Sequence, residues 1–318
     1  MMDNLTMDTS REDAKESIQA LLRQEAISYH CTDYTNSGQE RPICTPLHVV
    51  VECAKLVTDG WVSTPIDQDS LLMNSPSRVS DLIPSGSIED LYTMSEGSAR
   101  SVTHAFTNQE VELSCFSQWR HQMFHWACDV CESFSIDREI LAIAFNILDR
   151  YVAVEVKSEF AVSREDFQLF AMVSMYIAIK ANLSFRKLAV ETLIEMSRGY
   201  YTHEDIILTE KDILAALDWH INPTTVVGFC RLYLELFPCP IPSNLEATCN
   251  YMAELAVSDS YFVSKSNSSV ALAVMLLAAR REGVSLEETQ QLVDNLQGLV
   301  NIYDSDFEAT FRRLESLF

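Results

Sequence analysis

The chain has 318 residues, a hydrophobic content of 47% and a formal net charge of −23 at pH 7. This hydrophobic content excludes a wholly disordered chain, and the length allows two small domains with their own cores plus an N-terminal arm. The acidic excess lies on both sides of Leu113, which disfavours nucleic acid as a partner. No apolar run reaches the roughly 18 to 20 residues that cross a bilayer, and the first 16 residues are too polar for a secretion signal. We therefore expect a soluble intracellular protein with no membrane partner.

Residues 1–112 are expected to form an N-terminal regulatory region that is mostly flexible. Hydrophobic periodicity is poor from residue 31 to 100, and residues 62–100 are rich in Ser, Pro, Asp and Glu. One segment, 11–29, has near-helical spacing of apolar residues and predicts an isolated amphipathic helix with no obvious partner. Its apolar residues are Ile18, Leu21, Leu22, Ala26 and Ile27.

A first series of helices is predicted from about residue 115, with short connections between them. Ser163 with Asp166, and Thr202 with Asp205, each place a hydroxyl at a helix start and a carboxylate three residues on, as in a capping box. Pro223 ends the series, because the residue before a proline avoids helical geometry. The expected helices cover about 115–133, 137–153, 163–181, 184–198 and 202–219.

A second series after Pro223 repeats the first. Residues 171–180 and 271–280 are both apolar nearly all round and end in a basic residue. Such a helix must be the buried centre of a bundle. The sequence therefore predicts an all-α fold with two tandem five-helix bundles, at 113–222 and 223–318. The second set of helices is expected at about 224–237, 244–259, 267–282, 285–296 and 300–316.

The first series carries motifs in an order and spacing that resemble one known family. Residues 119–126 read Trp-Arg-His-Gln-Met-Phe-His-Trp, and residues 144–151 read Ala-Phe-Asn-Ile-Leu-Asp-Arg-Tyr. These runs resemble Met-Arg-x-x-Leu-x-x-Trp and Ala-Val-Asn-Tyr-Leu-Asp-Arg-Phe of the cyclins. The resemblance covers roughly 110 residues and implies two cyclin boxes, the first of which binds a kinase. Five hallmark positions of the family are filled: Arg120, Asp149, Leu169, Lys180 and Glu210.

The resemblance implies two roles for these five residues, one in stabilising the fold and one in binding a kinase. Arg120 and Asp149, with Leu169, are expected to stabilise the box, and a buried pairing of the two charges would fix one helix against another. Lys180 and Glu210 are expected to flank one patch that contacts a cyclin-dependent protein kinase. Docking there would hold the kinase's mobile helix inward, so that its catalytic glutamate can pair with the lysine that positions ATP.

A stripe on the first helix is a candidate docking groove for kinase substrates or inhibitors that carry an Arg-x-Leu motif. This role too is implied by the resemblance, and the chain departs from it where Trp119 replaces a methionine and Gln122 replaces an aliphatic residue. Ordinary core packing explains the stripe equally well. The residues concerned are Trp119, Gln122, Met123, Trp126, Asp129, Phe167 and Gln168.

The run Ala-Asn-Leu-Ser at residues 181–184 stands where many cell-cycle cyclins carry Phe-Glu-Glu. It resembles the lineage-expanded cyclins of single-celled algae and implies a different choice of kinase. Thr45, Thr64 and Ser75 each precede a proline and are candidate phosphorylation sites for proline-directed kinases.

Metal, cofactor and catalytic signals are weak. The nine cysteines are scattered, which favours free thiols in a reduced compartment. His121, His125 and Cys128 have the spacing of ligands on one helix, but a structural zinc site needs four ligands from converging segments, so we expect no metal. No glycine-rich phosphate loop or nucleophile motif is present, so we expect no cofactor and no catalysis by this chain.

The sequence thus predicts a regulatory subunit of a cyclin-dependent kinase that controls cell-cycle progression, in the nucleus and cytoplasm. A transcription-associated cyclin is an alternative that the sequence barely separates from it. A cyclin-fold promoter-binding factor would need a basic face, which the acidic balance disfavours. A scaffold without a kinase would leave Lys180 and Glu210 without a role.

Overall fold

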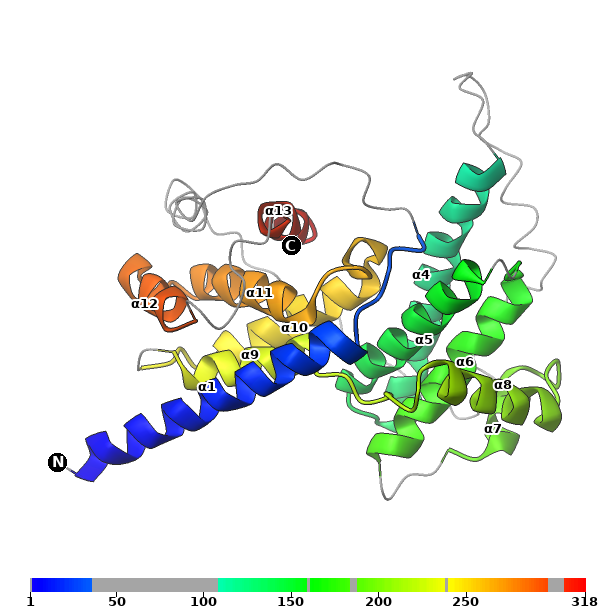
Figure 1. Ribbon diagram of the computed structural model, residues 1–318, viewed down its shortest axis with the longest axis horizontal. Helices are drawn as coiled ribbons and strands as arrows, with labels where there is room; N and C mark the ends of the chain where they lie inside the picture. The colour runs from blue at the N-terminus through cyan, green and yellow to red at the C-terminus, as the bar shows by residue number, and fades with distance from the viewer. Residues whose placement is uncertain (1, 36–107, 159–160, 184–187, 238–239, 297–305) are drawn as a thin grey trace.

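The computed structural model describes residues 2–35, 108–158, 161–183, 188–237, 240–296 and 306–318. Regular structure in these ranges is helical, and two helical bundles lie side by side (Figure 1). Among the described helices, none combines the length and hydropathy that a bilayer-spanning segment needs. The candidate phosphorylation sites Thr45, Thr64 and Ser75 lie outside the described residues.

The first bundle surrounds α6 (Arg164–Asn182), in which every residue from Phe170 to Ile179 is buried. Both predicted capping boxes are present, with Ser163 and Asp166 at the start of α6, and Thr202 and Asp205 at the start of α8. The other members are α4 (Asn108–Phe134), α5 (Glu139–Lys157), α7 (Val190–Met196) and α8 (His203–Ala216).

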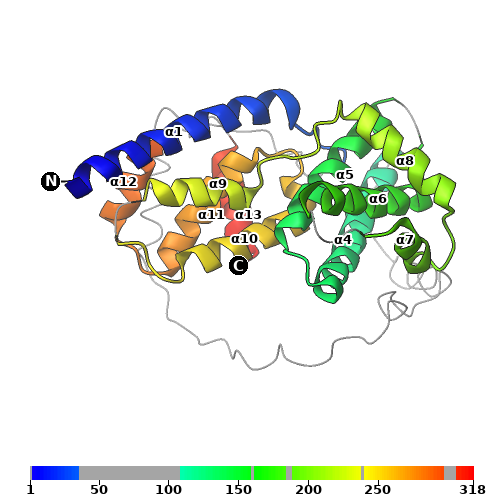
Figure 2. The ribbon, with the colours of Figure 1, turned by 90° about the horizontal axis from the view of Figure 1, so that it is seen from below.

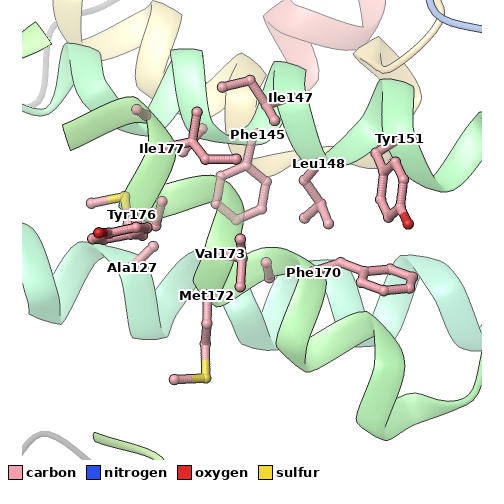
Figure 3. Packing of buried hydrophobic residues seen from close by; sticks show 14 of the residues in the cluster. Ala127, Phe145, Ile147, Leu148, Tyr151, Phe170, Met172, Val173, Tyr176 and Ile177 are labelled. Atoms are coloured by element: carbon pink, nitrogen blue, oxygen red, sulfur yellow. The ribbon is translucent and has the colours of Figure 1, made fainter. Parts of the chain in front are cut away.

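Packing between α5 and α6 forms the centre of the first core. Figure 3 shows Phe145 and Leu148 of α5 beside Val173 of α6. Farther along, the rings of Tyr151 and Phe170 meet edge to face with centroids 4.8 Å apart. These contacts fix α5 against α6, and so position the polar residues that the two helices carry at their margins.

The second bundle surrounds α11 (Asn267–Arg281), in which every residue from Ser268 to Ala279 is buried. The internal repeat predicted from the two apolar runs is therefore confirmed. Hydroxyl groups cap three of its helices, with Thr225 accepting from the Gly228 amide, Ser266 from the Ser269 amide and Ser285 from the Glu288 amide. The other members are α9 (Val226–Glu235), α10 (Leu245–Ser258), α12 (Leu286–Leu296) and α13 (Phe307–Ser316), with a short 3₁₀ turn, η3 (Ser260–Phe262), after α10.

Two predicted helix starts, at residues 184 and 300, lie outside the described residues. α7 is described from Val190, and Ala189 at its N-cap provides no side-chain hydrogen bond. α13 is described from Phe307. Residues 184–187 and 297–305, which precede these helices, lie outside the described ranges.

The N-terminal helix α1 (Met2–Ser28) does have a partner, which corrects the expectation of an isolated helix. It runs alongside α9 (Figure 2), and Ala14 and Ile18 are buried in the second core. Its Glu25 carboxylate accepts hydrogen bonds from the amide and hydroxyl of Ser268, at 3.1 and 2.6 Å, at the start of α11. Ile27 faces outward and is 84% exposed, so it does not belong to the packed face.

Candidate functional site

Arg120 of α4 and Asp149 of α5 form a buried, two-pronged ion pair. The Nε and Nη2 atoms of Arg120 each donate to one carboxylate oxygen of Asp149, both at 2.9 Å. The two residues are only 3% and 5% exposed. Burial disfavours the charged guanidinium and by itself lowers the pKa of Arg120. The attraction of the Asp149 carboxylate outweighs this effect, so the pKa of Arg120 is raised. The pairing implied by the resemblance is present, and Leu169 packs half-buried against the same core.

The ion pair also reaches beyond the first bundle. The Tyr34 hydroxyl, from the segment after α1, donates to Asp149 Oδ1 at 2.7 Å. On the other side, Arg120 Nη1 donates to the Val257 carbonyl at the end of α10, at 2.8 Å. One buried ion pair therefore joins both bundles and the N-terminal segment. The sequence did not indicate this, because Tyr34 lies in a stretch without hydrophobic periodicity.

Replacing Tyr34 with phenylalanine is expected to lower the free energy of unfolding by about 1.5 to 3 kcal/mol, as for hydrogen bonds to charged groups. The change removes one donor from the buried carboxylate of Asp149 and leaves the ring in place. Urea denaturation measures the loss. Tyr200→Phe is the matched control, because Tyr200 is 58% exposed; equal stability of the two variants would contradict the role of Tyr34.

The neighbouring Arg150 holds the end of α1 in a similar way. Its guanidinium lies 4.9 Å from the centre of the Tyr29 ring and donates to the His220 carbonyl at 2.8 Å. The Tyr29 ring in turn meets the His220 ring edge to face. Burial lowers the pKa of Arg150. Consecutive residues of α5 thus bind two points of the N-terminal segment, one through a carboxylate and one through a cation–π contact.

Lys180 and Glu210 lie together at the surface of the first bundle. Lys180 Nζ, at the end of α6, is 2.7 Å from Glu210 Oε1 on α8, and it also lies 5.2 Å from the centre of the Tyr176 ring. The Lys180 side chain is 55% exposed, whereas that of Glu210 is 11% exposed. The hydrogen bond that Lys180 donates to Glu210 raises the pKa of Lys180, so the amine stays charged. The structure therefore brings together the two residues that the resemblance assigned to one patch.

A large apolar side chain follows α8 on the same bundle. Trp219 is 71% exposed, and its φ angle of 61° is in the left-handed region, as is the 48° of Asp218. A bulky residue with such a φ angle carries backbone strain, which is common at functional positions. Sequence reasoning missed Trp219, since it counted the residue as the last of a helix.

The seven candidate docking residues differ in their exposure. Phe167 is fully buried, with ring centroids 6.0 Å from both Phe116 and Trp119. It is a core residue here, which agrees with the packing alternative. Gln122 accepts a hydrogen bond from Arg164 at 3.4 Å. The rest of the set is half-buried (Trp119, Met123, Trp126) or exposed (Asp129, Gln168), and docking at this stripe stays a prediction.

The fold defines the class of protein: two tandem five-helix bundles, each built round a buried helix and joined by a buried ion pair. Residues 88–222 match the family described as "Cyclin, N-terminal domain", and residues 224–318 match "Cyclin, C-terminal domain". The chain belongs to the cyclin family and has two cyclin domains.

Its relatives among characterised proteins are cell-cycle cyclins. A G2/mitotic-specific cyclin of Antirrhinum majus is 29% identical over 196 residues, which cover 61% of this chain and 42% of the relative. A G1/S-specific cyclin of Drosophila melanogaster is 32% identical over 114 residues, 36% of this chain and 15% of the relative. The chain thus spans less than half the length of these two relatives. A viral cyclin from herpesvirus saimiri shares the fold, with a TM-score of 0.50 and 18% identity over 64% of this chain and 86% of the viral one.

Proposed function

We propose that this chain is the regulatory subunit of a cyclin-dependent serine/threonine protein kinase, which it binds and activates to control cell-cycle progression. Membership of the cyclin family and the cell-cycle names of its relatives support this function. The observation that carries the proposal is the ion pair of an exposed Lys180 and a largely buried Glu210, held between two helices of the first bundle.

This ion pair can bind a partner without breaking. A lysine ammonium has three donor hydrogens and a carboxylate has two acceptor oxygens. The bond between Lys180 and Glu210 uses one donor hydrogen of the lysine and one oxygen of the glutamate. Further lysine donors and the second carboxylate oxygen are left for the backbone of a kinase. The bond also restricts the flexible Lys180 side chain before binding, and this lowers the entropy lost on association.

The chemistry would belong to the kinase. Docked against α6 and α8, the kinase helix that carries the catalytic glutamate would be held inward, where it completes the ion pair that positions ATP. The first bundle suits this task because residues Phe170 to Ile179 of α6 are all buried, which gives Lys180 a rigid support.

Trp219, which follows α8, is expected to contribute an apolar contact to the kinase interface. Replacing it with alanine should weaken kinase binding by about 2 kcal/mol or more, as for aromatic residues that dominate interfaces. The free energy of unfolding should change by less than about 0.5 kcal/mol, because the side chain is exposed. Calorimetric titration with the kinase measures the loss. Tyr251→Ala, at a 57% exposed aromatic residue of α10, is the control, and an equal loss in both variants would refute an interface at Trp219.

Affinity purification of the tagged chain from its own cells tests the proposal. We expect a cyclin-dependent kinase among the bound proteins, identified by mass spectrometry, and its loss with the double variant Lys180→Ala, Glu210→Ala. The double variant Arg280→Ala, Glu315→Ala is the matched control, because these residues form a similar exposed ion pair, 2.6 Å apart, in the second bundle. Absence of a kinase, or its retention by the first variant, would overturn the proposal.

A further inference from the structure

Two histidines stand one turn apart on the exposed face of α4. His121 and His125 have their Nε2 atoms 3.1 Å apart, with ring centroids at 4.5 Å and ring planes at 89°. Both side chains are exposed, and the helix that carries them continues on either side. This contact is a hydrogen bond between the two rings, and it holds two imidazole nitrogens together on the exposed face of the helix.

We propose that this histidine pair binds a divalent transition-metal ion. Imidazole suits Ni²⁺, Cu²⁺ and Zn²⁺, and two histidines four residues apart on a helix are a known arrangement for zinc. With metal–nitrogen distances of about 2.0 to 2.1 Å, a separation of 3.1 Å corresponds to an angle of roughly 98° at the metal. This angle lies between the square-planar and tetrahedral values, so the separation suits either geometry once a metal ion replaces the hydrogen bond and both Nε2 atoms bind the ion through their lone pairs.

The site has two protein ligands, not four. In the part of the chain that the structure describes, no group of three or more His, Cys, Asp and Glu residues is placed to hold a metal. Cys128, which shares the helical spacing, is half-buried. Water would complete the coordination. The site is therefore a chelate across one turn of α4, unlike the four-ligand zinc site considered from the sequence and not expected.

The surroundings favour a cation. Asp129 lies one turn beyond His125 and is close enough to interact with it electrostatically, and the chain as a whole carries a net charge of −23. A negative field raises the local concentration of metal ions. A bound ion would tie successive turns of α4 together, and because it binds the folded helix only, it would raise the unfolding temperature.

Calorimetric titration of the full chain with Ni²⁺, with thiols kept reduced, tests the site. We expect one binding site in the wild type. His121→Ala and His125→Ala should each lower the affinity for Ni²⁺ at least about tenfold, because even the loss of a residue that only supports a metal ligand lowers metal affinity about 10- to 100-fold. Ni²⁺ should also raise the unfolding temperature of the wild type but of neither variant. Both histidines are exposed, so the variants should fold and unfold like the wild type without metal.

Two controls separate this pair from other ligands. His203→Ala removes an exposed histidine of α8, and Cys128→Ser removes the thiol on the same helix; both should bind Ni²⁺ as the wild type does. Failure of the wild type to bind, or equal binding by His121→Ala, would overturn the proposal. A loss of binding in Cys128→Ser would overturn it too, because the site would then depend on a thiol.

Discussion

Replacing Asp149 with alanine is expected to lower the free energy of unfolding by about 3 to 5 kcal/mol, because it leaves the buried charge of Arg120 without a partner. Arg120 is 3% exposed, so water cannot replace the carboxylate. The loss should exceed that of Tyr34→Phe, which removes one hydrogen bond and keeps the ion pair. Denaturation in urea, followed by helical circular dichroism, measures both.

Glu315→Ala is the control for this prediction. It also removes one carboxylate from an arginine, Arg280, but in a pair whose glutamate side chain is 47% exposed. Exposed pairs contribute about 0 to 1 kcal/mol. A loss for Asp149→Ala no larger than that of the control would show that the buried pair does not hold the bundles together.

Replacing Ile18 with alanine is expected to cost about 2 to 5 kcal/mol of unfolding free energy, the range for buried Ile, Leu and Met residues. Ile18 is fully buried against the second core, so the substitution opens a cavity between α1 and that bundle. The weaker packing should also let α1 detach from the second bundle more often. Limited proteolysis followed by mass spectrometry would detect this as faster cleavage within α1.

Ile27→Ala is the matched control, with the same residue type on the same helix. Ile27 is 84% exposed, and its replacement should change stability by less than about 0.5 kcal/mol. Equal effects at both positions would mean that α1 does not pack on the second bundle in solution.

The sequence predicted the parts of the fold that depend on local pattern. Apolar runs at residues 171–180 and 271–280 identified the two central helices, since only a buried helix can be apolar nearly all round. Capping residues Ser163 and Thr202 marked two helix starts correctly. Each of these signals spans only a few neighbouring residues, so it can be recognised from a single sequence.

Contacts between distant segments could not be predicted in the same way. Tyr34 and Asp149 are 115 residues apart, and no periodicity links them. The apolar face of α1 indicated that the helix packs on something, but hydrophobic burial is non-directional and does not name the partner. The exposure of Trp219 depends on two residues with positive φ, which the sequence does not reveal, because neither is glycine.

Lys180 and Glu210 are an intermediate case. Each is ordinary on its own helix, and the family resemblance alone suggested that they share a patch. The structure supplies the distance of 2.7 Å and the half-exposed amine.

The most direct measurement is the rate at which the purified partner kinase phosphorylates a peptide, with and without a saturating concentration of this protein. We expect the wild type to raise this rate strongly, and the variant Lys180→Ala, Glu210→Ala to lose most of the activation while the Arg280→Ala, Glu315→Ala control keeps it. Equal activation by the wild type and the Lys180, Glu210 variant, or no activation by the wild type, would contradict a kinase-activating surface on α6 and α8.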